Sequence, residues 1–323
     1  MKDLSKNSVL RVSIDEAAAG QRIDNYLVKV LKGVPKSHLY RILRSGEVRV
    51  NSKRVDAAYR LQPGDALRIP PVRTAQPAPL HPQPRPPAQP RLAGAVLFED
   101  EHLLALDKPS GMAVHGGSGI SLGVIEQMRA ERPQAKFLEL VHRLDRETSG
   151  VLLLAKKRSA LTKLHALIRD GKLEKRYLAL VRGQWREQKR NVTLPLHKYV
   201  TAEGERRVSV DAEGQAAHTV FRLQKSWGDF SLLEAELKTG RTHQIRVHLA
   251  HLNFPIAGDD KYGDFALNKE LAKQGLKRMF LHAWKLALPH PASGEMLRLE
   301  APLPPELQRF LQSLDAGGRQ HGA

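Results

Sequence analysis

Residues 142–150 read HRLDRETSG, and the apolar run VLLLA follows directly at residues 151–155. A continuous apolar run of this length predicts a buried strand in the middle of a sheet. Asp145 then lies on a loop that leads into this strand, with Arg143 and Arg146 on either side. A salt-bridged turn would account for a single Asp–Arg pair. The whole run, with its histidine and Thr-Ser-Gly turn, indicates a functional loop instead.

Three further segments follow in the chain: KRYLALV at residues 175–181, TGRTHQIRVH at 239–248 and FLHA at 280–283. Together with HRLDRETSG, and in this order, they resemble the motifs of the RluA-type family of pseudouridine synthases. With the N-terminal part included, the likeness covers about residues 11–312. It implies an enzyme that isomerises uridine to pseudouridine in RNA, without cofactor or metal.

The resemblance also implies roles for individual residues. Asp145 would be the catalytic carboxylate, although the sequence leaves open whether it attacks the sugar, attacks the ring or removes a proton. Tyr177 would stack on the uracil and assist proton transfer, and Arg246 would keep Asp145 charged. The expected substrate-binding residues are Arg143, which would hold the flipped nucleotide, Arg241, a second choice as partner of Asp145, and Ile245 and Leu281, which would form an apolar wall.

Local patterns place the basic motif at the start of a helix. Residues 232–237 predict a strand, and Gly240 allows a turn after it. Thr242 is the expected N-cap. Ile245, Leu249 and Leu252 then share a helix face. Arg246 is therefore expected in the first turn of this helix, close to the end of the strand.

The composition favours an acidic partner. The chain has 52 Lys and Arg against 34 Asp and Glu, a formal net charge of +18, which predicts binding to nucleic acid. Because cysteine is absent, disulfides, thiolate catalysis and cysteine-based zinc sites are excluded. His243, His248 and His251 lack the spacing of zinc hydrolases, Ser149 lacks a G-x-S-x-G context, and residues 115–119 lack the lysine of a phosphate loop.

The sequence also sets expectations for location and assembly. The first residues show no apolar signal segment, and no apolar run is long enough to cross a bilayer. We therefore expect a cytoplasmic protein that does not contact membranes. We also expect a monomer.

A proline cluster divides the chain, because residues 70–90 hold nine of its twenty prolines. Such a segment cannot form a helix or a central strand and favours an extended spacer. The expected organisation is a first domain at residues 11–70, a proline-rich linker at 71–92, a catalytic domain at 93–313 and a disordered tail at 314–323.

Residues 1–70 contain 14 Lys and Arg and 7 Asp and Glu, a net charge of +7. Helices are expected at residues 22–31 and 36–44, followed by short strands at 48–51 and 66–69. The run RILRSGEVRVN at residues 41–51 resembles the S4 RNA-binding domain, a small domain of the α-L type. The resemblance implies an RNA-binding surface formed by Lys36, Arg41, Arg44 and Arg49.

The expected fold class is α+β, with a pseudouridine synthase catalytic domain on a central mixed, largely antiparallel sheet and the small S4 domain before it. The expected partner is 23S ribosomal RNA or a large-subunit assembly intermediate. Two alternatives stay open: a related synthase acting at other ribosomal positions or on transfer RNA, and a non-catalytic RNA-binding or assembly factor on the same scaffold.

Overall fold

The structure is a computed structural model, and it describes residues 9–16, 18–31, 33–72, 92–116 and 122–318. The chain divides into an N-terminal unit (residues 1–90) and a C-terminal unit (residues 91–323). The division falls in the proline-rich segment, of which residues 73–91 lie outside the described residues. Most of the glycine-rich stretch noted in the sequence, residues 117–119, lies outside them too.

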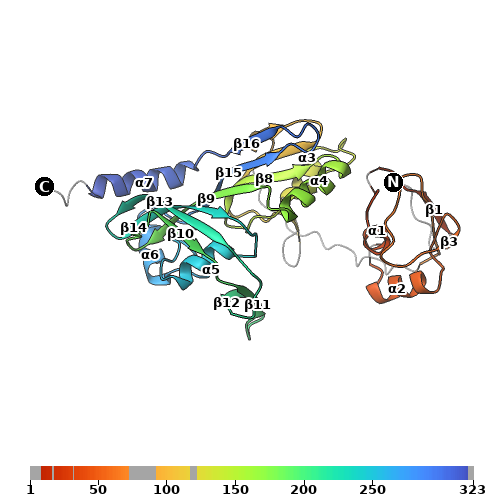
Figure 1. Cartoon of the computed structure of the whole chain (residues 1–323), viewed down its shortest axis with the longest axis horizontal. Coiled ribbons are helices and arrows are strands. Elements are labelled where there is room, and N and C mark those ends of the chain that lie inside the picture. Colours follow the sequence, from red (N-terminus) through yellow and green to blue (C-terminus); the bar gives the residue numbers. More distant parts are fainter. Residues whose placement is uncertain (1–8, 17, 32, 73–91, 117–121, 319–323) are drawn as a thin grey trace. The chain divides into compact units, whose positions relative to one another are not determined.

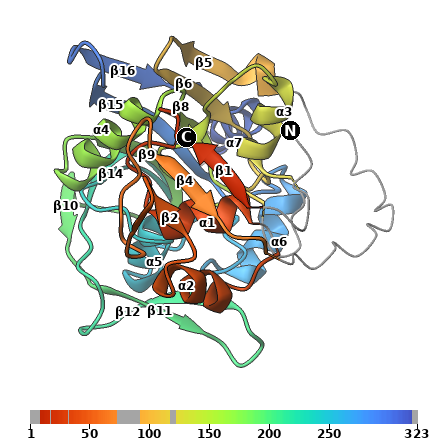
Figure 2. The ribbon, with the colours of Figure 1, turned by 90° about the vertical axis from the view of Figure 1, so that its right-hand side faces the viewer.

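The N-terminal unit has two helices beside a small antiparallel sheet (Figure 2). The helices are α1 (Ile23–Val30) and α2 (Lys36–Arg44), and the strands, in sheet order, are β1 (Leu10–Ser13), β4 (Ala66–Ile69), β2 (Arg49–Val50) and β3 (Lys53–Arg54). Leu39, Ile42 and Leu43 are buried on one face of α2, as their spacing predicts. Gly46 follows the helix with φ +74°, a left-handed conformation that favours glycine and ends the helix.

The C-terminal unit is built on one mixed sheet (Figure 1). Its order is β10 (Lys189–Val192), β13 (Thr219–Trp227), β14 (Phe230–Leu237), β9 (Glu174–Arg182), β15 (Leu281–Pro289), β8 (Ser149–Ala155), β6 (Leu103–Lys108) and β5 (Val96–Glu99). In addition, β16 (Met296–Glu300) pairs with β15, and β7 (Glu139–Leu140) pairs with β8. Among the described strands only β8 and β15 run parallel, so the predicted α+β class with a largely antiparallel sheet is confirmed.

Two further strands, β11 (Leu196–Val200) and β12 (Arg206–Val210), form a separate hairpin that extends away from the large sheet (Figure 1). The helices of this unit are a 3-10 turn, η1 (Leu92–Ala95), and α3 (Val124–Glu131), α4 (Arg158–Arg169), α5 (Gln244–His251), α6 (Phe265–Lys273) and α7 (Pro305–Gly318). No helix in the described part of the chain is long and apolar enough to cross a membrane.

Helices cover both faces of the sheet. The side chains of a strand alternate between the two faces, so neighbouring residues of one strand pack against different helices. Leu152 and Tyr177 belong to the hydrophobic cluster that contains residues of α3 and α5. Leu153, on the other face, packs with α4. Leu180 of β9 packs with residues of α6 and α7 on that second face. The segments of the predicted site therefore meet on the face that carries α3 and α5.

Two boundaries differ from those expected. Leu92 was assigned to the linker but is buried against the catalytic core. At the other end, α7 continues to Gly318, so residues 314–318 of the expected disordered tail are helical. Leu314 packs against the cluster of α6 and α7, and Asp315 accepts a hydrogen bond from Trp227 Nε1 at 2.6 Å. Residues 319–323 lie outside the described residues.

The expected N-cap of α5 is wrong. The helix begins at Gln244, and its N-cap is His243 in the left-handed conformation (φ 53°, ψ 20°) rather than Thr242. The side chain of Gln244 reaches back instead, and its Oε1 accepts hydrogen bonds from Arg241 N–H (3.0 Å) and the Thr239 hydroxyl (2.7 Å). The turn before the helix is therefore closed by Gln244, and Arg246 still lies in the first turn.

The predicted strand after the aspartate loop is the centre of the core, since every residue of β8 is buried. Its second residue, Gly150, has φ +107° and pairs with Ala283 of the parallel strand β15. A Cβ atom at this position would lie 2.2 Å from the Ala283 carbonyl oxygen. A side chain is thus excluded both by the backbone conformation and by the neighbouring strand.

We predict that Gly150→Ala lowers the free energy of unfolding by at least about 3 kcal/mol, because strand separation and backbone strain add. Urea unfolding followed by tryptophan fluorescence measures this, because all three tryptophans lie in the C-terminal unit.

The matched control is Gly171→Ala. Gly171 also has positive φ (+68°), but a Cβ there would meet nothing within 4 Å. In this variant the free energy of unfolding should fall only by the backbone strain, about 1–2 kcal/mol. Equal losses for the two variants would contradict the importance of the close approach between β8 and β15.

Candidate active site

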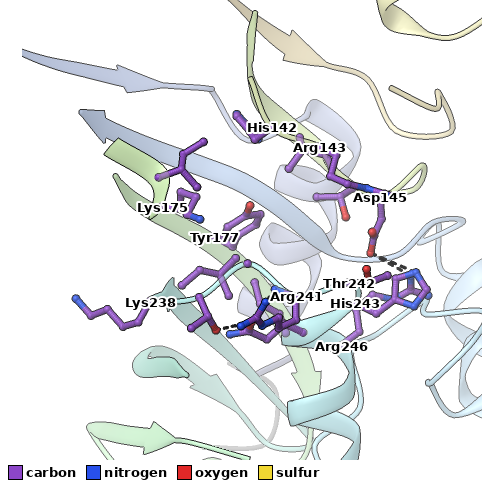
Figure 3. Close-up of a pocket in the computed structure, with 18 of the residues that line it drawn as sticks. His142, Arg143, Asp145, Lys175, Tyr177, Lys238, Arg241, Thr242, His243 and Arg246 are labelled. Atoms are coloured by element: carbon purple, nitrogen blue, oxygen red, sulfur yellow. Dashed lines mark hydrogen bonds and ion pairs between the residues drawn. The ribbon is translucent and has the colours of Figure 1, made fainter. Parts of the chain in front are cut away.

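A cavity of about 670 Å³ opens on the sheet face that carries α5. The aspartate loop, the start of β9 and the segment between β14 and α5 form its walls (Figure 3). All seven residues predicted for catalysis and substrate binding line it: Arg143, Asp145, Tyr177, Arg241, Ile245, Arg246 and Leu281. The tertiary structure thus brings together side chains from four distant segments.

A buried lysine anchors the backbone of the aspartate loop by hydrogen bonds. Lys108, at the end of β6, is 0% exposed, and its Nζ donates to the carbonyls of Pro109 (2.8 Å), Met112 (2.7 Å) and Arg146 (3.0 Å). Ser110 Oγ also donates to the Glu147 carbonyl at 2.7 Å. Burial lowers the pKa of Lys108 to about 7. These bonds hold the backbone on the C-terminal side of Asp145.

Arg246 links two carboxylates. Its Nε and Nη2 donate to Asp259 Oδ2 and Oδ1, both at 2.7 Å, and its Nη1 donates to Asp145 Oδ2 at 3.3 Å. The side chain is only 5% exposed. Burial alone would lower the pKa of Arg246, but Asp259 and Asp145 together raise it above its usual value. The guanidinium therefore stays charged and has one donor group fixed on Asp145.

The turn that supplies Asp259 is sterically defined. Gly258 has φ +77°, and a Cβ there would lie 2.2 Å from the Arg278 carbonyl oxygen. Asp259 Oδ1 also accepts the backbone N–H groups of Lys261 (2.9 Å) and Tyr262 (3.0 Å). Although burial acts to raise the pKa of Asp259, its bonds to Arg246 hold that pKa below the usual value. Asp259 is not among the residues predicted from the sequence; the glycine–aspartate pair that opens GDDKYG at residues 258–263 is the signal that could have indicated this turn.

Tyr177 forms part of the cavity wall. It is 7% exposed and belongs to the same hydrophobic cluster as Ile245 and Leu281. Burial, and then the nearby Asp145 carboxylate, raise the pKa of Tyr177 well above its usual value. The cavity environment therefore favours the neutral phenol over the phenolate.

The two arginines expected to contact substrate do not bind Asp145. Arg241 Nε donates to the Ala216 carbonyl at 3.0 Å, so of the two candidates Arg246 is the partner of the aspartate. Arg143 is exposed at the cavity wall. Its neighbour His142 supports the loop, since its Nε2 accepts the Leu153 N–H at 3.1 Å, and burial and then Lys175 lower its pKa to about 4.

Lys175 also lines the cavity, although the family resemblance implied no role for it. It lies two residues before Tyr177 on β9, hence on the same face of the strand. Burial lowers its pKa. Among the described residues no carboxylate forms an ion pair with it. Arg169 and Lys238 also line the cavity, so its walls carry more positive than negative charge.

One group of described residues has metal-ligand atoms within 4.8 Å of one another: Asp100, His102 and His290. None of the three lines the cavity. His290 Nδ1 accepts the Ser293 N–H at 3.2 Å, so its proton lies on Nε2, which donates to Asp100 Oδ2 at 2.8 Å. This arrangement closes two neighbouring turns by hydrogen bonds, and we assign no metal to it.

In the N-terminal unit, the four predicted RNA-binding residues lie close together in the sequence and are all exposed to solvent. Lys36, Arg41 and Arg44 lie on α2, Arg49 lies on β2, and all four are exposed. Arg49 also lines a surface cavity of about 620 Å³, together with Arg11 and Arg68. This surface offers several guanidinium groups to an anion.

Comparison with known families gives two matches. Residues 102–251 match the family described as RNA pseudouridylate synthase, and residues 21–67 match the S4 domain. The predicted resemblance to both families is confirmed, and the first match contains Asp145, Tyr177 and Arg246.

Individual relatives extend the match to almost the whole chain. It is 53% identical over 309 residues to "Ribosomal large subunit pseudouridine synthase C" of Escherichia coli K12, covering 95% of this chain and 97% of the relative. The relative of the same name from Pasteurella multocida is 52% identical, over 95% and 94%. Among solved structures, "Human RNA Pseudouridylate Synthase Domain Containing 4" is 27% identical with a TM-score of 0.57, over 69% of this chain and 94% of the other.

We predict that Asp259→Asn destabilises the C-terminal unit by about 3–5 kcal/mol, because it leaves the buried Arg246 without its main counter-charge. The amide oxygen can still accept the two backbone N–H groups of the turn, so the substitution isolates the effect of charge. Urea unfolding of both forms measures the difference.

The neighbouring carboxylate provides the control. Asp260 lies 3.6 Å from Arg246 Nη2, but its side chain is 71% exposed. Asp260→Asn should change stability by no more than about 0.5 kcal/mol, as is usual for exposed pairs. A larger loss for Asp260→Asn than for Asp259→Asn would show that the buried pair is not the main constraint.

Proposed function

The chain belongs to the RNA pseudouridylate synthase family, and from this premise we propose that it isomerises uridine to pseudouridine in large-subunit ribosomal RNA, with Asp145 as the catalytic carboxylate. The observation that carries the assignment of Asp145 is its place in the cavity. It is 20% exposed there and bound by a guanidinium that a second aspartate holds in place.

The reaction breaks the bond between uracil N1 and the sugar C1′ and forms a bond between C5 and C1′. The C5 proton is lost and N1 gains a proton, so the change is redox-neutral and requires no cofactor. The carboxylate can serve as nucleophile or as base. Since Arg246 binds Oδ2, Oδ1 is the oxygen we assign to the reaction.

The environment of Tyr177 supports a stacking role. A neutral, buried ring beside Ile245 and Leu281 provides a flat apolar surface for the uracil. The neutral phenol can donate a hydrogen bond to the substrate. We assign proton removal to Asp145, whose carboxylate Arg246 binds.

A base in folded RNA must leave its stack before it can enter the cavity, at a free-energy cost of a few kcal/mol. The cationic cavity walls can offset this cost by binding the phosphates next to the flipped nucleotide. We assign Arg143 to the flipped nucleotide and Arg241 and Lys175 to the phosphates. Leu281 and Ile245 would contact the base.

The S4 domain would add sequence-tolerant affinity through Lys36, Arg41, Arg44 and Arg49. The names of the bacterial relatives favour large-subunit ribosomal RNA, which in bacteria includes the 23S RNA, or an assembly intermediate that contains it. Action on other ribosomal positions or on transfer RNA is the competing proposal within the family. Cytoplasmic location and a monomeric state remain our predictions.

We predict that Asp145→Asn abolishes conversion, with a rate at least about 10³-fold lower, because the amide is neither nucleophile nor base. Pseudouridine mapping of ribosomal RNA from cells lacking the gene, complemented with either form, measures the activity and its target sites together. The folding control is urea unfolding, which should change little, because Asp145 is partly exposed.

Restoration of the same large-subunit sites by both forms would reject Asp145 as the catalytic residue. Loss of pseudouridine from transfer RNA alone would identify transfer RNA as the substrate. No change at any site would favour the alternative of a non-catalytic RNA-binding factor.

A second prediction concerns the S4 surface. Replacing Arg41 and Arg44 by glutamine should weaken binding to a large-subunit RNA transcript and reduce the slope of log K against log salt by about 0.7–0.9 per phosphate contact removed. Filter binding across a salt series measures both quantities.

Arg41→Lys with Arg44→Lys keeps the charges and should keep the slope. An unchanged slope in the glutamine variant would place the phosphate contacts elsewhere on the protein.

A further inference from the structure

Two hydrogen bonds connect His243, which faces Asp145, to the β11–β12 hairpin. His243 Nε2 lies 3.9 Å from Asp145 Oδ2, and a dashed line in Figure 3 marks the interactions of this carboxylate with its neighbours. His243 Nδ1 lies 2.8 Å from the Tyr262 hydroxyl. The same hydroxyl oxygen accepts the backbone N–H of Val208 at 3.0 Å. Neither His243 nor Tyr262 belongs to the expected catalytic set.

The bond from Val208 favours one direction for the bond between Tyr262 and His243. The Val208 N–H can only donate, so the Tyr262 oxygen is an acceptor in that bond. Among the hydrogen bonds of the described residues, His243 Nδ1 is the one acceptor within reach of the phenolic proton, so we assign Tyr262 as the donor and Nδ1 as the acceptor. Burial lowers the pKa of His243 and raises the pKa of Tyr262 to about 12, so both groups are neutral near pH 7. A neutral imidazole that accepts at Nδ1 carries its proton on Nε2, the nitrogen that faces Asp145.

The position of the ring has a structural basis. His243 adopts the left-handed conformation at the N-cap of α5, which is uncommon outside glycine and occurs at functional sites. The Tyr262 ring packs edge-on against His243 at 5.5 Å and lies 5.1 Å from the guanidinium of Arg246. Tyr262 thus contacts both groups that face the aspartate.

We propose that His243 is a positioning residue for Asp145, that its Nε2–H binds Oδ2 once uridine fills the cavity, and that Tyr262 fixes the required tautomer. The proposal rests on Asp145 being the reactive carboxylate. A movement of about 1 Å brings the 3.9 Å separation to hydrogen-bond distance, and such contacts tighten in substrate complexes. Arg246 and His243 then hold the same oxygen and leave Oδ1 for the reaction.

The charges around His243 agree with a neutral donor. Asp145 faces it from the aspartate loop, Arg246 from α5, and Asp259, Lys261 and Tyr262 from the turn after α5. The cations Arg246 and Lys261 oppose a positive charge on the ring, whereas the two carboxylates favour it. Burial tips the balance toward the neutral form.

The first experiment is ¹⁵N NMR of histidine-labelled full-length protein at pH 7.5. His243 is assigned by the signal missing from His243→Asn, whose asparagine tolerates the left-handed conformation. We expect a protonated Nε2 and an unprotonated Nδ1 in the wild type, and loss of this preference in Tyr262→Phe. A wild-type ring protonated on Nδ1 at this pH would overturn the proposal whatever the substrate is.

The second experiment measures kcat and KM by tritium release from a large-subunit transcript labelled at uracil C5. His243→Asn removes the donor and should lower kcat by about 10–100-fold with little change in KM, whereas His243→Gln, which can place an N–H near the Nε2 position, should recover part of the rate. The matched control is His251→Asn, because His251 is an exposed histidine of the same helix and should retain wild-type kcat.

The pH profile separates tautomer control from a purely structural effect. In Tyr262→Phe, neutral His243 can place its proton on Nδ1, but protonation of the ring restores Nε2–H. Since burial lowers the pKa of His243, the ratio of variant to wild-type kcat should rise as the pH falls from 8 to 5, with most of the rise at the acidic end. A constant ratio, or equal activity of the asparagine and glutamine variants, would reject the proposal. If the wild type released no tritium, the proposed RNA substrate would be rejected, and the NMR result alone would decide the role of His243.

Discussion

The active site depends on one buried guanidinium. A buried arginine without counter-charge is strongly destabilising, so Arg246 requires the carboxylate of Asp259, which takes two of its donor groups in a planar pair. The remaining Nη1 can then point in only one direction, toward Asp145. A turn far along the chain from Asp145 therefore orients the proposed catalytic group, together with the loop backbone that Lys108 anchors.

The sheet order explains why the four motif segments meet. The parallel strands β8 and β15 begin at the same edge, which places the aspartate loop beside Leu281. Strand β9 runs antiparallel between β15 and β14, with Tyr177 opposite Ala283 on one side and Ala235 on the other. The end of β14 then lies beside the start of β9, and the segment leading to Arg246 follows from there. The close approach at Gly150 is a condition for this arrangement.

Exposed and buried basic groups of this protein differ in how readily they carry a charge. The surface is rich in Lys and Arg, as binding to RNA requires, whereas burial keeps several interior bases neutral or easily neutralised. Burial lowers the pKa of His282 to about 4 and that of Lys108 to about 7. Arg246 and Asp259 are buried as an ion pair, and further basic residues, among them Arg143 and Lys175, line the cavity around Asp145. An RNA phosphate is thus attracted to the walls of the cavity, while the uracil meets a largely apolar interior.

Local sequence determined a good part of this protein. It predicted the buried strand β8 and the bounds of α2 with its buried face, because helix and strand periodicity are local properties. The α+β class and the cavity residues from Arg143 to Leu281 were implied by the resemblance of contiguous motifs to a known family. It did not indicate Asp259, the Tyr262–His243 contact or the anchoring of the aspartate loop by Lys108. These interactions join residues that are far apart in the chain or share no periodic pattern, such as Lys108 Nζ and the Arg146 carbonyl. The packing of the folded unit decided which buried donor met which acceptor, because most buried polar groups pair within the fold and those partners lie far apart in the sequence.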